Sequence, residues 1–81
     1  MKSIDEIIGF KKTIEIIRYI HDNPGKSIDD ITADCSVSPA TFYRHRIVAK
    51  NVLQVEIKNK KSKNVHGYVI SNYGILRKSM L

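Results

Sequence analysis

The residues with the clearest chemistry in this sequence are basic side chains in its second half. Residues 35–81 carry nine lysines and arginines and one acid, Glu56, whereas residues 1–34 carry five bases and seven acids. The net charge of +6 on the 81-residue chain is therefore divided into −2 and +8. This asymmetry predicts a polyanionic partner for the second half. Nucleic acid is the first candidate and an anionic membrane surface the second, and a solvated basic face without a partner is the alternative.

Groups that could bind a metal or catalyse a reaction are few. The three histidines and the single cysteine do not stand at the short spacings of zinc sites: they are His21, His45, His66 and Cys35. No glycine-rich phosphate loop or nucleophile motif occurs, and a chain of this length has room for one core without a deep pocket. We therefore expect no metal and no cofactor, and we do not expect an enzyme. Cys35 is expected to pack as a small apolar residue.

Capping residues and apolar periodicity predict a first helix from Ser3 to about Asp22. Its apolar side chains fall on three sides, whereas a surface helix buries one stripe. A domain of this size does not surround such a helix, so we expect a second copy of the chain to cover part of it. The alternative is a break near Gly9 that folds the first part back over the domain. The residues expected at the dimer contact are Ile4, Ile8, Ile16, Tyr19 and Ile20.

Two shorter helices are expected next. Ser27 opens the first of them, which ends near Cys35 because turn residues follow. Ser38 caps the second, with Pro39 at the first helical position, where a missing N–H does no harm. This helix is expected to run to about Lys50.

After this helix the apolar period changes from about 3.6 to 2. Leu53, Val55 and Ile57 alternate with polar residues, which predicts a half-buried strand. A polar loop over residues 59–64 and a second strand over residues 65–70 complete a β-hairpin. Ser71 is then expected to cap a short final helix. The apolar residues of that helix are Ile75, Leu76, Met80 and Leu81.

Residues 31–45, ITADCSVSPATFYRH, resemble the helix-turn-helix of winged-helix transcriptional regulators, and residues 67–74, GYVISNYG, resemble the end of the family's wing strand. The resemblance implies one α+β domain, a winged helix-turn-helix with a three-helix core, a two-stranded β-hairpin wing and a short C-terminal helix. Its expected parts are the first helix with the dimer contact (1–26), the helix-turn-helix (27–50), the wing (52–70) and the C-terminal helix (71–81).

Three positions depart from the family pattern. Arg46 and Ala49 stand where such regulators carry large aliphatic residues, and Ser36 replaces a common turn glycine. The turn is therefore expected to differ slightly in shape. The residues expected to complete the core in place of Arg46 and Ala49 are Ile47, Val48 or Val52, and an outward position on the third helix is the alternative for Ile47.

The resemblance implies a homodimeric regulator of transcription, most simply a repressor, that binds double-stranded DNA. Its third helix lies in the major groove and its lysine-rich wing lies on the backbone or in the minor groove. Arg44 is the first candidate for reading a guanine, and a phosphate clamp is the alternative role for it. The residues expected to contact DNA are Ser38, Ala40, Thr41, Tyr43, Arg44, Arg46, Lys50, Lys58, Lys60, Lys61 and Lys63.

Two other functions are compatible with the same residues. A small basic protein can coat or bend DNA without reading its sequence, as an architectural factor does. A winged helix can also serve as a protein-interaction module, docking here through its first helix. The absence of a long apolar run and the acidic N-terminus predict a cytoplasmic protein that does not insert into a membrane. The sequence does not identify a small-molecule effector.

Overall fold

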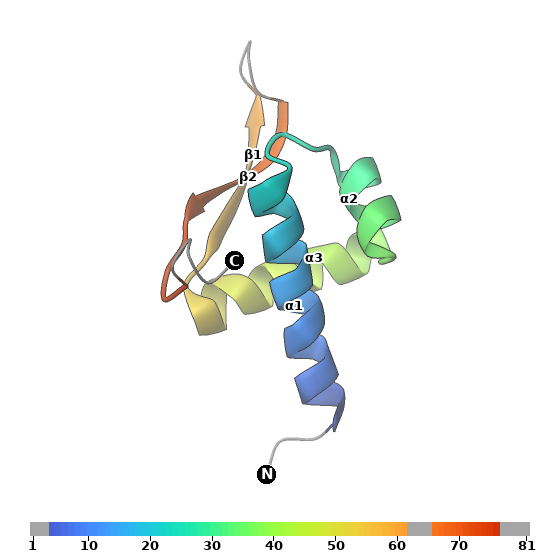
Figure 1. Ribbon diagram of the computed structural model, residues 1–81, viewed down its shortest axis with the longest axis vertical. Coiled ribbons are helices and arrows are strands. Elements are labelled where there is room, and N and C mark those ends of the chain that lie inside the picture. Colours follow the sequence, from blue (N-terminus) through green and yellow to red (C-terminus); the bar gives the residue numbers. More distant parts are fainter. Residues whose placement is uncertain (1–3, 62–65, 77–81) are drawn as a thin grey trace.

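The computed structural model describes the backbone of residues 4–61 and 66–76, with side chains from residue 11 onward. The described residues form three α-helices, α1 (Ile4–Asp22), α2 (Ile28–Cys35) and α3 (Pro39–Val48). A π-helical turn, η1 (Ala49–Leu53), extends α3, and two strands, β1 (Glu56–Lys61) and β2 (His66–Asn72), form an antiparallel hairpin. Helix α1 crosses α3, with α2 on one side of α1 and the hairpin on the other (Figure 1). This α+β arrangement was expected.

Local capping explains where α2 and α3 begin. The Ser27 hydroxyl accepts a hydrogen bond from the Asp30 amide, and the Ser38 hydroxyl accepts one from the Thr41 amide, both at 3.2 Å. Pro39 occupies the first turn of α3, as predicted. Ser36 ends α2 in the left-handed conformation at φ +57°, so a serine takes the conformation that a glycine usually adopts at this position.

Every helix and strand that the structure describes contributes to the core. Its buried side chains are at most 8% exposed: Ile16, Ile17, Ile20, Ile31, Cys35, Phe42, Ala49, Leu53, Val55, Ile57 and Tyr68. Cys35 therefore packs as an apolar residue, as expected. The alternation predicted for residues 53–57 is present in the burial, although the strand itself begins only at Glu56.

The dimer contact expected on α1 is wrong for two of its residues. Ile16 and Ile20 are each 1% exposed because α2, α3 and the hairpin pack around α1 on more than one side, so they belong to the core of the single chain. Tyr19 is half-buried against the same core. The side chains of Ile4 and Ile8 lie outside the described residues.

The residues that complete the core at the end of α3 differ from those expected. Ala49 and Leu53 are buried, whereas Ile47 and Val52 are 60% and 50% exposed, and Val48 is half-buried. Ala49 and Leu53 follow the buried Phe42 by seven and eleven residues, so at about 100° per residue both fall on its side of the helix. Ala49 therefore fills the position for which a larger aliphatic residue was expected. The prediction that Ile47 or Val52 would enter the core is wrong.

The end of the chain also differs from the prediction. Strand β2 continues to Asn72, so Ser71 lies in a strand and does not cap a helix. Residues 73–76 form a turn in which Gly74 has φ +57° and the Ile75 amide donates to the Leu53 carbonyl at 3.0 Å. A Cβ on Gly74 would lie 2.2 Å from that carbonyl oxygen, so the turn requires glycine. The rest of the expected final helix, including Met80 and Leu81, lies outside the described residues.

Strand β2 also pairs with the segment between α1 and α2. The Tyr68 amide donates to the Lys26 carbonyl at 2.8 Å, and the Gly25 amide donates to the Tyr68 carbonyl at 3.0 Å. Gly67 permits this approach because it has φ +119°, and a Cβ there would lie 2.4 Å from the Lys26 oxygen. The hairpin is therefore fixed to the helices through β2, which leaves β1 as the strand beside α3.

Candidate nucleic-acid interface

The outward face of α3 is a row of exposed side chains opposite its buried residues. Phe42 and Ala49 face the core, and at about 100° per residue the opposite face carries Ala40, Arg44 and Ile47. All three are exposed, and Ile47 is 60% exposed. Asn51, four residues after Ile47 in η1, is exposed as well. These four residues form the outer row of α3, which a helix could present to a groove of duplex DNA.

The two hydroxyls at the start of α3 serve the helix itself. The Ser38 hydroxyl donates to the Thr41 hydroxyl at 2.9 Å, in addition to accepting from the Thr41 amide. Ser38 is exposed and Thr41 is half-buried. Both stand at the N-terminal end of α3 as expected, and their first role is to cap this helix.

Tyr43 and Arg46, both expected to face DNA, contact the hairpin. The Arg46 Nε donates to the Ile57 carbonyl at 2.9 Å, and the guanidinium lies 5.5 Å from the centre of the Tyr68 ring. Burial and a hydrogen bond with Tyr43 raise the pKa of Tyr68. The expectation of Arg46 as an outward DNA contact is therefore corrected, because it is half-buried with its Nε bonded to β1. Tyr43 remains 44% exposed beside it.

An open cleft of about 360 Å³ separates α3 from β1. Lys50 stands on the helix side and Lys58 on the strand side, and both are exposed. The apolar part of the lining includes Ile47, and Glu56 is the acid within it. The cleft thus lies between the outer row of α3 and strand β1, with Lys50 on one side and Lys58 on the other.

The hairpin presents its lysines on both faces of β1. Ile57 points into the core, so Lys58 and Lys60 share the opposite face, while Lys61 lies on the same side as Ile57 beyond the core. All three lysines are exposed, and none forms an ion pair with an acid that the structure describes. Lys63, expected to act with them, lies outside the described residues.

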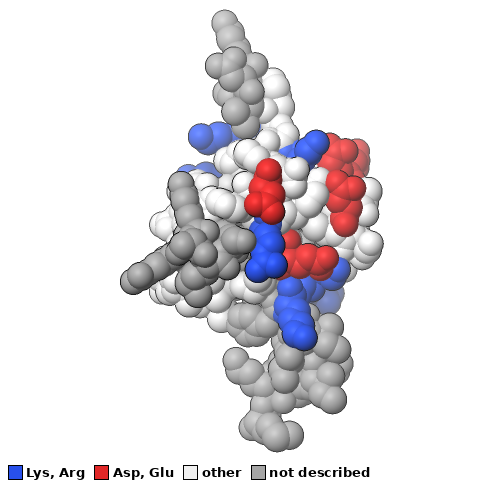
Figure 2. Space-filling view, viewed as in Figure 1, with Lys and Arg blue, Asp and Glu red and all other residues white. Residues whose placement is uncertain are grey.

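Acidic side chains gather on another part of the molecule. Asp29, Asp30 and Asp34 are exposed on α2. Figure 2 shows acidic side chains over the α2 region at the upper right, and acids and bases are mixed across the α1 side that faces the viewer. The helix α2 and the α1 surface are therefore poorly suited to a polyanion, in contrast to α3 and β1.

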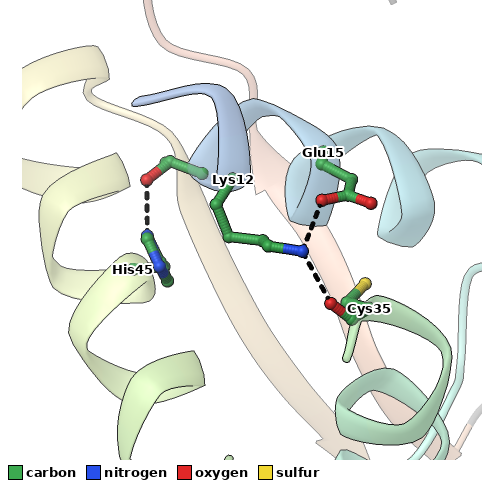
Figure 3. Close-up of polar contacts among 5 residues, drawn as sticks. Lys12, Glu15, Cys35 and His45 are labelled. Carbon is green, nitrogen blue, oxygen red and sulfur yellow. Dashed lines mark hydrogen bonds and ion pairs between the residues drawn. The ribbon is translucent and has the colours of Figure 1, made fainter. Parts of the chain in front are cut away.

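A polar network joins α1 to α2 and α3 (Figure 3). The Lys12 ammonium donates to the Cys35 carbonyl and pairs with the Glu15 carboxylate, both at 2.8 Å. The Thr13 hydroxyl lies 2.7 Å from Nδ1 of His45. Burial, with smaller effects from Lys12 and Arg44, lowers the pKa of His45. His45 is therefore favoured in its neutral form, where it holds α3 against α1.

The remaining candidate ligands do not come together. The His21 Nδ1 lies 2.7 Å from the Tyr73 hydroxyl, and burial raises the pKa of the Cys35 thiol. His66 is exposed on the hairpin. Among the residues that the structure describes, no group of three potential metal ligands lies together, and no helix is long and apolar enough to cross a membrane.

No family model, curated protein or solved structure matches this chain. The site is thus defined by geometry alone, which adds Asn51 to the residues expected and places Ile47 on the outward face rather than in the core. Ile47 and Asn51 belong to the outer row of α3, and neither is a basic residue of the kind that marks a DNA contact in a sequence. The spacing of Ile47 and Asn51 from Arg44 can be read from the sequence. The π-helical turn that contains Asn51 cannot.

Proposed function

We propose that the chain is a winged helix-turn-helix domain that binds duplex DNA and regulates transcription. Helix α3 lies in the major groove and the β1–β2 wing follows the phosphate backbone. The observation that carries the proposal is the outer row of α3, exposed along its length and flanked by the unpaired lysines of β1. A helix in this position can present Arg44 to a guanine, and cations beside it can neutralise phosphates.

The proposed regulator acts as a homodimer, and repression by occlusion of a promoter is its simplest mechanism. The first turns of α1 project beyond the body of the domain (Figure 1), and Ile4 and Ile8 lie in these turns. A twofold dimer would place two α3 helices about one helical turn of DNA apart, or a multiple of it. The sequences that the protein selects should then be palindromic.

The test is selection of a binding sequence from random duplexes, followed by titration with fluorescent DNA. Binding is measured at about 50 and 200 mM salt with random competitor. The wild type should prefer its selected site by about 10³-fold or more. Arg44→Ala should lose about 1–3 kcal/mol of discrimination at one base pair. Arg18→Ala is the matched control, because it removes the same charge from an exposed position on α1 and should change little.

Each other outcome supports a different function. If Arg44→Ala weakens binding to every duplex equally, Arg44 clamps a phosphate and reads no base. If the wild type binds all duplexes equally, the protein is an architectural factor. If it binds no duplex at the lower salt, DNA binding is wrong and a protein-interaction module becomes the better proposal.

A further inference from the structure

The outer row of α3 contains an exposed apolar side chain, Ile47. Attraction between basic residues and phosphates does not explain its exposure. Ile47 is 60% exposed, although it lies between the charged residues Arg44 and Lys50 on a helix whose buried face is already complete. Phe42 and Ala49, both 0% exposed, fill that buried face. Ile47 therefore contributes little to the core and presents a branched aliphatic group outward.

We infer that Ile47 reads the 5-methyl group of a thymine in the major groove, and this inference rests on the proposed function. Ile47 follows Ala40 by seven residues and Arg44 by three, so the three side chains share one face of α3. A helix that places Arg44 against a base edge places Ile47 about one turn further along the same groove. The thymine methyl is the apolar group that the major groove presents there.

The chemistry of isoleucine selects against the other pyrimidine. Ile47 has no hydrogen-bond acceptor, so a cytosine at this position would bury its N4 amine without a partner. Cytosine also lacks the methyl group and offers less apolar area to the side chain. Both effects favour thymine, and together with Arg44 they predict a half-site in which a guanine and a thymine lie close together.

Replacement of thymine by deoxyuridine tests the inference, because it removes the methyl group and leaves the Watson–Crick edge unchanged. Each thymine of the selected site is replaced in turn, and the Kd is measured for wild type, Ile47→Ala and Val52→Ala. Each half-site should contain one thymine whose single replacement weakens binding of the wild type about fourfold, as expected for one buried methyl group. Ile47→Ala should abolish this difference between thymine and deoxyuridine.

Val52→Ala is the matched control. Val52 is a 50% exposed aliphatic residue in η1, outside the outer row of α3, so this variant should keep the deoxyuridine penalty. Because both side chains are exposed, both variants should fold, which circular dichroism checks.

Three outcomes would overturn the inference. The first is a selected site without thymine beneath α3, the second is a wild type that is indifferent to every replacement, and the third is an Ile47→Ala variant that keeps the full penalty. In each of these cases sequence-selective DNA binding persists and the proposed function stands. Failure of the wild type to bind any duplex would overturn both.

Discussion

Lys12 on α1 and Lys58 on β1 are lysines at the surface of the same small domain, yet their surroundings differ. The Lys12 ammonium is bonded to the Cys35 carbonyl and to Glu15, whereas Lys58 has no acidic partner among the described residues. The same contrast separates the regions to which they belong. In the α1–α2 region the Tyr19 hydroxyl is also bonded, to Asp34, and this bond is the main cause that raises the pKa of Tyr19 to about 12.

The difference indicates how each region uses its polar groups. In the α1–α2 region, charges and hydroxyls connect one helix to another and stabilise the fold. In the α3–β1 region, Arg46 is the one described cation with a hydrogen bond to another element, the Ile57 carbonyl of β1. The other described cations of this region are exposed to solvent. Removal of the partnered Lys12 should therefore affect stability, and removal of the unpartnered cations of the α3–β1 region should affect binding.

The largest expected effect comes from the unpartnered lysines of β1. The double variant Lys58→Gln/Lys60→Gln should reduce the salt dependence of DNA binding by about 0.9 in log–log slope per lysine, and so by about 3.6 for the dimer, because four phosphate contacts are lost. The ratio of affinities at about 50 and 200 mM salt should then shrink on the order of 10²-fold. Thermal stability should stay within about 0.5 kcal/mol of wild type, because both side chains are exposed.

A charge-matched control distinguishes direct lysine–phosphate contacts from attraction of DNA by the overall charge of the protein. Lys11→Gln/Arg18→Gln removes two charges from exposed positions on α1. It should leave the slope close to that of the wild type, since charges far from the interface are largely screened at these salt concentrations. Equal slopes for the two double variants would show that the wing does not touch the backbone.

The opposite result is expected for the partnered lysine. Lys12→Met keeps the aliphatic stem but removes the hydrogen bond to the Cys35 carbonyl and the ion pair with Glu15. We expect a loss of about 1 kcal/mol in unfolding free energy, measured by urea denaturation, with DNA affinity unchanged. Lys11→Met is the control, because Lys11 is exposed next to it. A Lys12→Met variant as stable as the control would remove the distinction between the two regions.

The start of each short helix could be predicted from the sequence because its signal is local. Ser27, Ser38 and Pro39 determine where α2 and α3 begin, and the structure confirms all three positions. The alternation of Leu53, Val55 and Ile57 likewise predicted which of these side chains are buried. Such patterns depend on residues that are close neighbours along the chain, so they can be recognised in the sequence itself.

Features that depend on distant contacts could not be predicted in this way. The π-helical turn η1 has no local propensity signal, yet it continues α3 to Leu53, which is buried, and contains Val52, which is exposed. A serine can cap a helix or lie in a strand, and for Ser71 the pairing of β2 with β1 decides between them. The dimer contact assigned to Ile16 and Ile20 failed because three elements of the same chain cover α1.

The smallest expected effect is the pH dependence of the contact between α1 and α3. Burial, then Lys12 and Arg44, lowers the pKa of His45 in the folded chain below its ordinary value of 6.5. The unfolded chain therefore takes up a proton first, so the contribution of His45 to stability is complete above pH 6.5 and decreases as the pH falls below it. The fall in Tm from about pH 7.5 to 5.5 should be smaller for His45→Gln than for wild type, whereas His66→Gln, at an exposed position, should resemble wild type. An equal fall in all three proteins would show that protonation of His45 costs the fold nothing.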